Sequence, residues 1–199
     1  MVSAIRPAVT SDSRVHIRRV KKRDEQEFIA LMRDSQTLHE PWISPPTNPM
    51  MFKYYLQRIE REDHEGFVIC RNIDERIVGA ININHIVRGS FQSASLGYYV
   101  GAEFQGEGFM AEGLQLLVHH AFHTLGLHRL EANIQPDNLR SQNLVERCGF
   151  IKEGYSPQFL FINGAWRDHE RWCCVHHRQG LRAQVSLEPT NIKRKGDPR

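Results

Sequence analysis

Residues 98–111 have the sequence YYVGAEFQGEGFMA, and this stretch decides the fold. A run of aromatic and β-branched residues ends at Val100, a short loop follows, and Gly106 and Gly108 precede a long apolar periodicity. Glycine permits a positive φ and lets a ligand approach the backbone closely. The first N–H groups of a helix have no partner within the helix, and the helix dipole favours an anion there. The stretch therefore predicts a strand, a phosphate-binding turn and a helix.

Outward from this stretch, the spacing of apolar residues separates helices from strands. Downstream, apolar residues recur at helical spacing until Gly126, which is placed to end the helix. Upstream, alternating runs separated by turn residues predict an antiparallel meander, and Asn163-Gly164 predicts a late hairpin. Asp24 with Glu27 predicts a capping box for the first helix. Strands are expected at 16–18, 66–71, 76–87, 93–101, 127–135, 158–162 and 166–175, and helices at 24–32, 51–62, 108–125 and 139–149.

This order of elements predicts an α/β fold. A twisted, mixed and mostly antiparallel central sheet is expected, with about four helices on its faces. One domain is expected over residues 15–178, between a flexible arm at 1–14 and a disordered tail at 179–199. The basic run at 193–195 in that tail is expected to be solvated, with RNA contact as the alternative.

The composition is that of a globular domain and excludes several classes of protein. Of 199 residues, 40% are hydrophobic and 25% are charged, which argues against collagen, coiled coil and wholesale disorder. The net charge of +3 is too balanced to indicate nucleic-acid binding. The apolar runs are too short to span a bilayer, and the first residues lack the apolar segment of a secretory signal. Four cysteines without metal-ligand spacing indicate a reduced protein, so we expect a cytoplasmic one that requires neither membrane nor nucleic acid.

Three known phosphate-binding patterns compete for the glycine-rich turn. A Walker A loop is excluded because the Gly-Lys-Ser/Thr sequence is absent. A Rossmann fingerprint is matched formally by Gly106, Gly108 and Ala111, with Glu131 further on. However, four residues separate the strand from the first glycine, and the upstream meander is not a βαβ unit. A plain strand-to-helix connection with flexible glycines also stays open.

A third pattern is supported by three blocks that occur in order. Residues 105–110 resemble the acetyl-CoA-binding motif Q/R-x-x-G-x-G/A of the GNAT N-acetyltransferases, except that Met110 stands where that motif has a small residue. Residues 138–154 resemble the family's second block, N-x-x-S followed by G-F-x-x-E-G. Residues 162–169 are similar to the closing hairpin of the RimJ/RimL branch, which acetylates N-terminal amines of ribosomal proteins. The resemblance covers about residues 17–175 and implies the GNAT fold.

The resemblance also implies a cosubstrate, acetyl-CoA, and the residues that would bind it. The backbone at Tyr99 and Val100 would pair with the pantetheine arm, and N–H groups from Gly106 to Ala111 would hold the pyrophosphate. Asn138 would lie near the pantetheine, and a helix N-cap is an equally good role for it. The implied cofactor-binding residues are Tyr99, Val100, Gln105, Gly106, Glu107, Gly108, Phe109, Met110, Ala111, Asn138 and Asn143.

The implied chemistry is direct attack of a neutral amine on the thioester, which needs a base and a proton donor for the thiolate. The resemblance points to Ser141 as the donor, with a structural role as the alternative. The tyrosine that many GNAT members use is replaced by Val145, and the glutamate of RimL-like members by Leu160. Alternation along its strand lets Glu131 reach the site through water, and a salt bridge is its alternative. Glu103 is a poorer candidate for the base.

The acceptor is expected to be the N-terminal amine of a protein, a ribosomal protein among the candidates. An α-amino group loses its proton near ~8 and a lysine side chain near ~10.4, so a weak set of bases favours the α-amine. The alternatives are a small-molecule amine such as an antibiotic, a polyamine or an amino-sugar, and a CoA-binding module without catalysis. The protein is expected to be a monomer or a homodimer.

The remaining histidines and aromatic residues are given lesser roles. His119 and His123 stand four residues apart, but no HExxH motif or ligand-spaced Cys or Asp accompanies them, so no metal is expected. Several aromatic residues are suited to line an acceptor groove, although burial in the core is favoured for each of them singly. These residues are Trp42, Tyr54, Tyr55 and Trp166.

Overall fold

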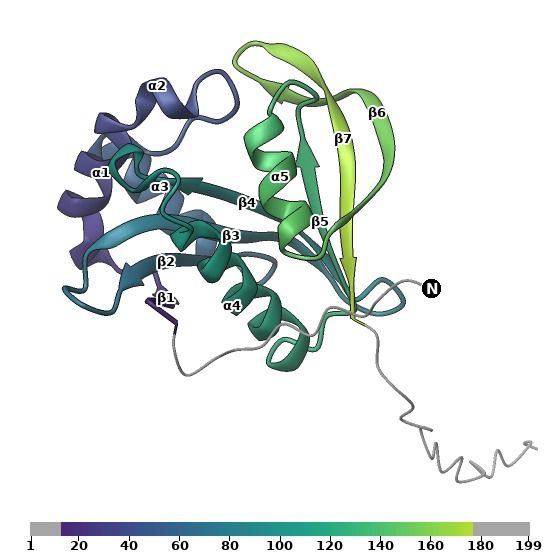
Figure 1. The fold of residues 1–199 in the computed structure, drawn as a ribbon, viewed down its shortest axis with the longest axis horizontal. Helices are drawn as coiled ribbons and strands as arrows, with labels where there is room; N and C mark the ends of the chain where they lie inside the picture. Colours follow the sequence, from purple (N-terminus) through teal and green to yellow (C-terminus); the bar gives the residue numbers. More distant parts are fainter. Residues whose placement is uncertain (1–12, 177–199) are drawn as a thin grey trace, which may run out of the picture.

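The computed structural model describes residues 13–176, which form one seven-stranded sheet with helices on both faces (Figure 1). The strand order is β1-β2-β3-β4-β5-β7-β6. The strands are β1 (Val15–Arg19), β2 (Glu65–Arg71), β3 (Ile77–Val87), β4 (Ser93–Val100), β5 (Arg129–Ile134), β6 (Ile151–Ile162) and β7 (Ala165–Val175). The helices are α1 (Glu25–Asp34), α2 (Gln36–His39), α3 (Pro49–Ile59), α4 (Phe109–His123) and α5 (Leu139–Arg147).

The expected mixed sheet is confirmed, with α2 as a short addition to the four expected helices. The expected tail at 179–199, its basic run, and residues 1–12 of the expected arm lie outside the described residues. Ser13 and Arg14 of that arm are described and are hydrogen-bonded to α4, as detailed below. No helix within residues 13–176 is both long enough and apolar enough to cross a membrane.

Helices α4 and α3 cover opposite faces of the sheet. A Cβ atom built on Gly113 of α4 would lie 2.4 Å from Cδ1 of Ile69 in β2. A Cβ atom built on Gly66 of β2 would lie 2.7 Å from Cδ1 of Ile59 in α3. Residues 66 and 69 are an odd number of positions apart, so their side chains point to opposite faces. The two glycines thus permit close packing of one helix on each face.

The start of α1 differs from the expected capping box. The Asp24 carboxylate does not cap α1 but accepts a hydrogen bond of 2.7 Å from the N–H of Lys21 and pairs with Arg18. Glu27 instead accepts a hydrogen bond of 2.6 Å from the N–H of Ile77 at the start of β3. The capping prediction was wrong because a 3₁₀ turn at Lys22–Asp24 precedes the helix and shifts the cap by one turn.

The strands β4 and β5 form the parallel pair of the sheet, and they separate before they end. Their pairing runs from Ser93 opposite Arg129 to Leu96 opposite Ala132. Beyond that point β4 continues to Val100 beside β3, while β5 follows β7 in another direction (Figure 1). We call residues 97–100, on the side away from β3, the free edge of β4. Because α4 follows β4 and α5 follows β5, the N-terminal ends of both helices come after this divergence.

Candidate active site

The free edge of β4 presents backbone groups that have no partner strand. The N–H of Gly101 donates to the carbonyl of Val78 in a 2.8 Å hydrogen bond, so Gly101 is paired toward β3. Successive residues of a strand direct their backbone groups to alternate sides, so Tyr99 also pairs toward β3. The backbone groups of Tyr98 and Val100 therefore face the free edge. Of the two residues predicted to pair with a pantetheine arm, Val100 is suitably oriented, whereas Tyr99 is not.

The start of α4 combines two left-handed glycines with uncapped amides. Gly106 has φ +85° and Gly108, the N-cap residue, has φ +86°, and no side chain caps the helix. The N–H of Ala111 bonds to the carbonyl of Gly108 at 3.0 Å. Within the described residues, the N–H groups of Gly108, Phe109 and Met110 have no hydrogen-bond partner. The N–H of Gly106, just before the helix, has no partner in this part of the chain either, so only Glu107 and Ala111 drop out of the predicted set. The geometry of the remaining amides suits a bound anion.

The side chains of this turn leave its outer surface open. Gln105 and Glu107 are exposed, whereas Phe109 and Met110 are buried. The Met110 side chain packs toward the sheet, where its Cε would lie 2.9 Å from a Cβ atom built on Gly79. The bulk of Met110 therefore points away from the exposed amides, so the departure from the small-residue motif does not obstruct them.

A hydroxyl pair links the free edge to α5. The hydroxyls of Tyr98 and Ser141 lie 2.5 Å apart. Burial raises the pKa of Tyr98 far above its ordinary value, although the hydrogen bond from Ser141 acts in the opposite direction. The tyrosine is therefore protonated at neutral pH and can relay a proton to the serine. The sequence singled out Ser141 but not Tyr98, because alternation alone does not tell which of Tyr98 and Tyr99 faces α5.

Asn138 and Asn143, both predicted to bind cofactor, occupy different positions on α5. Asn138 is the N-cap residue, and its Oδ1 accepts a hydrogen bond of 3.2 Å from the N–H of Ser141. This leaves its Nδ2 available for another partner. Asn143 is exposed and follows Ser141 by two positions, which corresponds to about 200° around a helix. The structure therefore does not bring Asn143 to the side of α5 that carries the hydroxyl pair.

Glu131, the predicted base, is held by two arginines. Its Oε1 accepts from Nε of Arg129 at 2.8 Å and its Oε2 from Nη2 of Arg171 at 2.5 Å. Burial alone would raise the pKa of Glu131, but the two arginines outweigh it and lower that pKa. A carboxylate with a lowered pKa is a poor proton acceptor, so the arrangement favours the salt-bridge alternative. Glu103 is paired with Arg76 at 2.6 Å on the surface.

His39 of α2, not singled out in the sequence, contacts the free edge. Its Nε2 lies 2.8 Å from the carbonyl of Val100, which can only accept a hydrogen bond, so Nε2 carries the proton. Burial lowers the pKa of His39, although the Val100 carbonyl opposes this effect. Nδ1 is buried and has no partner within residues 13–176. The ring is therefore neutral and adds no charge beside β4.

The loop after α2 meets the turn of the β6–β7 hairpin. Asn163 donates through Nδ2 to the carbonyl of Pro41 at 3.0 Å and accepts from Ser44 at 2.9 Å. The carbonyl of Trp42 accepts a hydrogen bond from Gln135 at the end of β5. This loop thus connects the ends of β5 and of the hairpin on the side of the molecule that carries α2.

The aromatic residues do not share one environment. Tyr55 is buried in the core and Trp42 is half-buried, but Tyr54 is 62% exposed and Trp166 is 61% exposed. Burial in the core was therefore the wrong expectation for Tyr54 and Trp166. The exposed ring of Trp166 packs against Phe161, so this part of the hairpin presents an aromatic surface.

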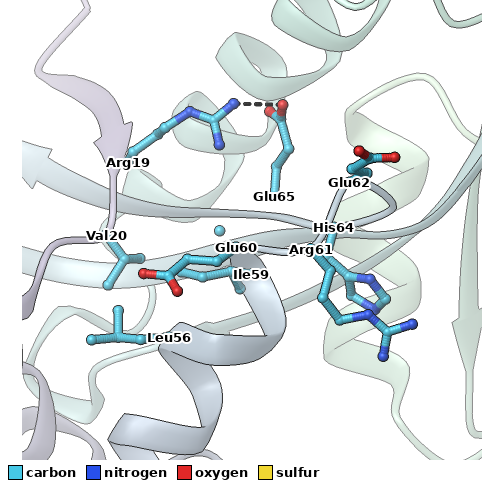
Figure 2. Close-up of a pocket in the computed structure, with 10 residues that line it drawn as sticks. Arg19, Val20, Leu56, Ile59, Glu60, Arg61, Glu62, His64 and Glu65 are labelled. Carbon is cyan, nitrogen blue, oxygen red and sulfur yellow. Dashed lines mark hydrogen bonds and ion pairs between the residues drawn. The ribbon is translucent and has the colours of Figure 1, made fainter.

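Other candidate sites in the described part of the chain are less informative. No three His, Cys, Asp or Glu residues of positions 13–176 come together to hold a metal ion. A pocket of about 330 Å³ lies between the end of α3 and the strands β1 and β2 (Figure 2). Its wall is mostly charged and includes Arg19, Glu60 and His64, and none of its residues belongs to the predicted site.

Comparison with known proteins identifies the family. The family model described as "Acetyltransferase (GNAT) domain" matches residues 14–151, which is more than half of the chain. The chain belongs to the GNAT acetyltransferase family. The resemblance of the sequence to this family is therefore confirmed.

Individual GNAT proteins similar to this chain have different named substrates. The [ribosomal protein uS5]-alanine N-acetyltransferase of Escherichia coli is 44% identical over 96 residues, 48% of this chain and 50% of that protein, so the match spans half its length. The spermidine N(1)-acetyltransferase of Vibrio cholerae is 26% identical over 158 residues, 77% of this chain and 88% of that protein. The structure of Mycobacterium smegmatis RimJ in complex with CoA-disulfide is 28% identical, with a TM-score of 0.72 over 81% of each chain.

Proposed function

We propose that this protein transfers the acetyl group of acetyl-CoA to the N-terminal α-amine of a protein. The observation that carries the proposal is the uncapped start of α4, directly after the free edge of β4. The N–H groups of Gly108, Phe109 and Met110 would bind the diphosphate. The backbone groups of Tyr98 and the N–H of Val100 would pair with the pantetheine arm, as an added strand would, whereas the Val100 carbonyl already accepts from His39.

The hydroxyl pair supplies the proton that the reaction needs at sulfur. The lone pair of the neutral amine forms a C–N bond with the acetyl carbon, and the C–S bond breaks with its electron pair going to sulfur. Ser141 then gives its hydroxyl proton to the thiolate and regains a proton through Tyr98. The surplus proton of the amine passes back through this pair or to water, so the products are an amide and a thiol.

The acceptor is proposed to be an α-amine because the site provides little help with deprotonation. Glu131 is neutralised by Arg129 and Arg171, and Leu160 has no acid–base function. An α-amine is already partly neutral near ~8, whereas a lysine side chain or a polyamine nitrogen is not. The similarity to the uS5-alanine acetyltransferase supports an alanine-initiated ribosomal protein as the first acceptor to test.

Release of free thiol from acetyl-CoA tests this proposal. Peptides that begin with alanine or serine are compared with the same peptides carrying a blocked N-terminus and an internal lysine. We expect thiol release with free N-termini and background rates with blocked ones. Equal rates with both peptides would contradict an α-amine acceptor.

The similarity to a spermidine acetyltransferase favours a second candidate, a small polyamine acceptor. Thiol release with spermidine but with no peptide would support this candidate. A third possibility is a module that binds acetyl-CoA without turnover, and the leucine at position 160 favours it. Tight binding of acetyl-CoA with no thiol release from any amine would support it.

A further inference from the structure

Arg14 reaches the start of α4 from a position more than 90 residues away in the sequence. Its Nε and Nη2 lie 2.8 Å and 2.5 Å from Oε1 of Glu112, and its backbone N–H donates to Oε2 of the same carboxylate at 2.9 Å. The guanidinium also lies 4.6 Å from the centre of the Phe109 ring. Both oxygens of Glu112 are thus bonded to a single residue.

A further hydrogen bond from Arg14 reaches the phosphate-binding turn itself. Nη2 of Arg14 donates to the carbonyl of Glu107 at 2.8 Å. This carbonyl belongs to the peptide unit that joins Glu107 to Gly108. Glu107 is flanked by Gly106 and Gly108, and both glycines have a positive φ. Without a side-chain constraint, glycine populates many backbone conformations, so this peptide unit would otherwise rotate readily.

The orientation of that carbonyl determines the orientation of an amide. In a trans peptide the C=O and the following N–H point in opposite directions. The carbonyl of Glu107 is drawn toward Arg14, so the N–H of Gly108 points away from the guanidinium. The N–H of Gly108 is one of the three unpartnered amides at the start of α4.

The pair also adjusts the charge beside this anion site. A carboxylate in the first turn of a helix interacts favourably with the helix dipole, but it would repel a diphosphate bound to the same turn. The guanidinium of Arg14 offsets the charge of Glu112 at contact distance. A Cβ atom built on Gly108 would lie 3.2 Å from Nη2 of Arg14, which shows how close this cation is to the turn.

We propose that Arg14 and Glu112 are positioning residues that hold the peptide between Glu107 and Gly108 in the orientation that binds the diphosphate of acetyl-CoA. This inference rests on the proposed function. Ordering a turn before the ligand arrives reduces the entropic cost of binding, so the pair increases affinity without touching the reacting atoms. An ordinary surface ion pair would join β1 to α4 equally well but would not restrict the turn.

The chain offers a matched control in Arg19. Arg19 is the last residue of β1, whereas Arg14 directly precedes that strand. Arg19 pairs with Glu65 (Figure 2), and the two groups lie 2.5 Å apart. The side chains of Arg19 and Arg14 are 56% and 53% exposed, so the two arginines are similarly placed relative to solvent. Arg19 does not bond to the turn at 105–110. Arg19→Ala thus removes a comparable ion pair without releasing the turn.

The test measures acetyl-CoA affinity of the full chain by titration calorimetry, with the melting temperature as a check on folding. We expect Arg14→Ala to raise Kd about tenfold and Arg19→Ala to change it less than about twofold. Arg14→Lys keeps the charge but not the forked geometry, so we expect an intermediate Kd. Glu112→Gln is expected to raise Kd as well, because its amide holds the guanidinium less firmly.

A truncated thioester separates positioning from general damage. S-acetyl-pantetheine lacks the diphosphate, so Arg14→Ala should leave its KM unchanged and should leave kcat with saturating acetyl-CoA unchanged. Equal effects of Arg14→Ala and Arg19→Ala on Kd would overturn the inference, as would equal increases in KM for both thioesters. If the unaltered protein does not bind acetyl-CoA at all, the proposed function fails and the inference fails with it.

Discussion

The two parallel strands β4 and β5 are each followed by a helix, and the two helices differ in whether a side chain caps their first turn. Before α4 the N-cap is Gly108, with a positive φ and no capping side chain. Before α5 the N-cap is Asn138, whose side chain accepts from the N–H of Ser141. The same topology thus gives one helix start that carries a side-chain cap on the N–H of Ser141 and one that carries no side-chain cap. At α4 the absence of a capping side chain leaves the first amides open to a ligand.

The largest expected effect is the loss of acetyl-CoA affinity when a side chain is introduced at Gly108, the uncapped start of α4. Gly108→Val introduces a branched side chain at φ +86° with its Cβ 3.2 Å from Nη2 of Arg14, which strains the turn and displaces its amides. We expect the Kd for acetyl-CoA to rise by at least about 1000-fold, because several hydrogen bonds to a charged group are lost. Calorimetric titration measures this change.

Gly126→Val is the matched control for this substitution, because Gly126 also has a positive φ but lies beyond the C-terminal end of α4. It should reduce stability comparably and leave the affinity intact. An unchanged Kd in Gly108→Val would mean that the anion does not bind at the start of α4.

The next effect concerns the hydroxyl pair that bridges the two connections. Ser141→Ala removes the proposed proton donor, so we expect kcat to fall about 100-fold with little change in the KM for acetyl-CoA. Tyr98→Phe keeps the ring but not the relay, and we expect a decrease of about tenfold. Steady-state kinetics with an alanine-initiated peptide measure both, and full activity of Ser141→Ala would remove the serine from the mechanism.

A smaller effect is expected from uncapping the second helix. Asn138→Ala should destabilise the protein by about 1 kcal/mol because the N–H of Ser141 loses its side-chain acceptor. Chemical denaturation measures this free energy of unfolding. Asn143→Ala, on an exposed position of the same helix, should show no such loss. Equal stability of the two variants would contradict the capping role of Asn138.

The smallest expected effect is the loss of stability when the ion pairs of Glu131 on β5 are removed. The pKa of Glu131 is lowered in the folded protein, so its ion pairs stabilise the fold above the unfolded pKa of about 4.3 and cease to do so as pH falls through the folded value. We therefore expect Glu131→Gln to be less stable than the unaltered protein at pH 7, and the difference to shrink toward pH 3. A pH-independent difference would argue against the ion pairs.

The sequence was sufficient for the order of elements and for the glycine turn, because both depend on local patterns. Apolar periodicity and turn residues act within a few positions, and they located α4 and the turn of the final hairpin correctly, although β6 begins at Ile151 and not at 158. The capping box at Asp24 failed because the 3₁₀ turn at Lys22–Asp24 moved the cap, and Glu27 is bonded instead to the N–H of Ile77. Local rules do not include such competition from distant backbone groups.

Parts of the site that depend on distant contacts could not be predicted. Arg14 was assigned to a flexible arm because its partners, Glu107 and Glu112, lie more than 90 residues away. His39 reaches Val100 only because α2 lies against β4. A basic residue just before the first strand, together with an acid in the first turn of α4, was the available signal for the first of these contacts.

The free edge of β4 affects the tendency of the protein to aggregate in solution. An unpaired strand edge is a template on which another polypeptide can pair, and such pairing begins aggregation. On this side of β4 the unpaired stretch is short, at residues 97–100, and β5 diverges beside it, which leaves little length for another chain to pair. We expect the narrow pantetheine arm of coenzyme A, which has two amides, to cover this edge better than a peptide does. Purified stocks should then resist turbidity longer when coenzyme A is included in the buffer.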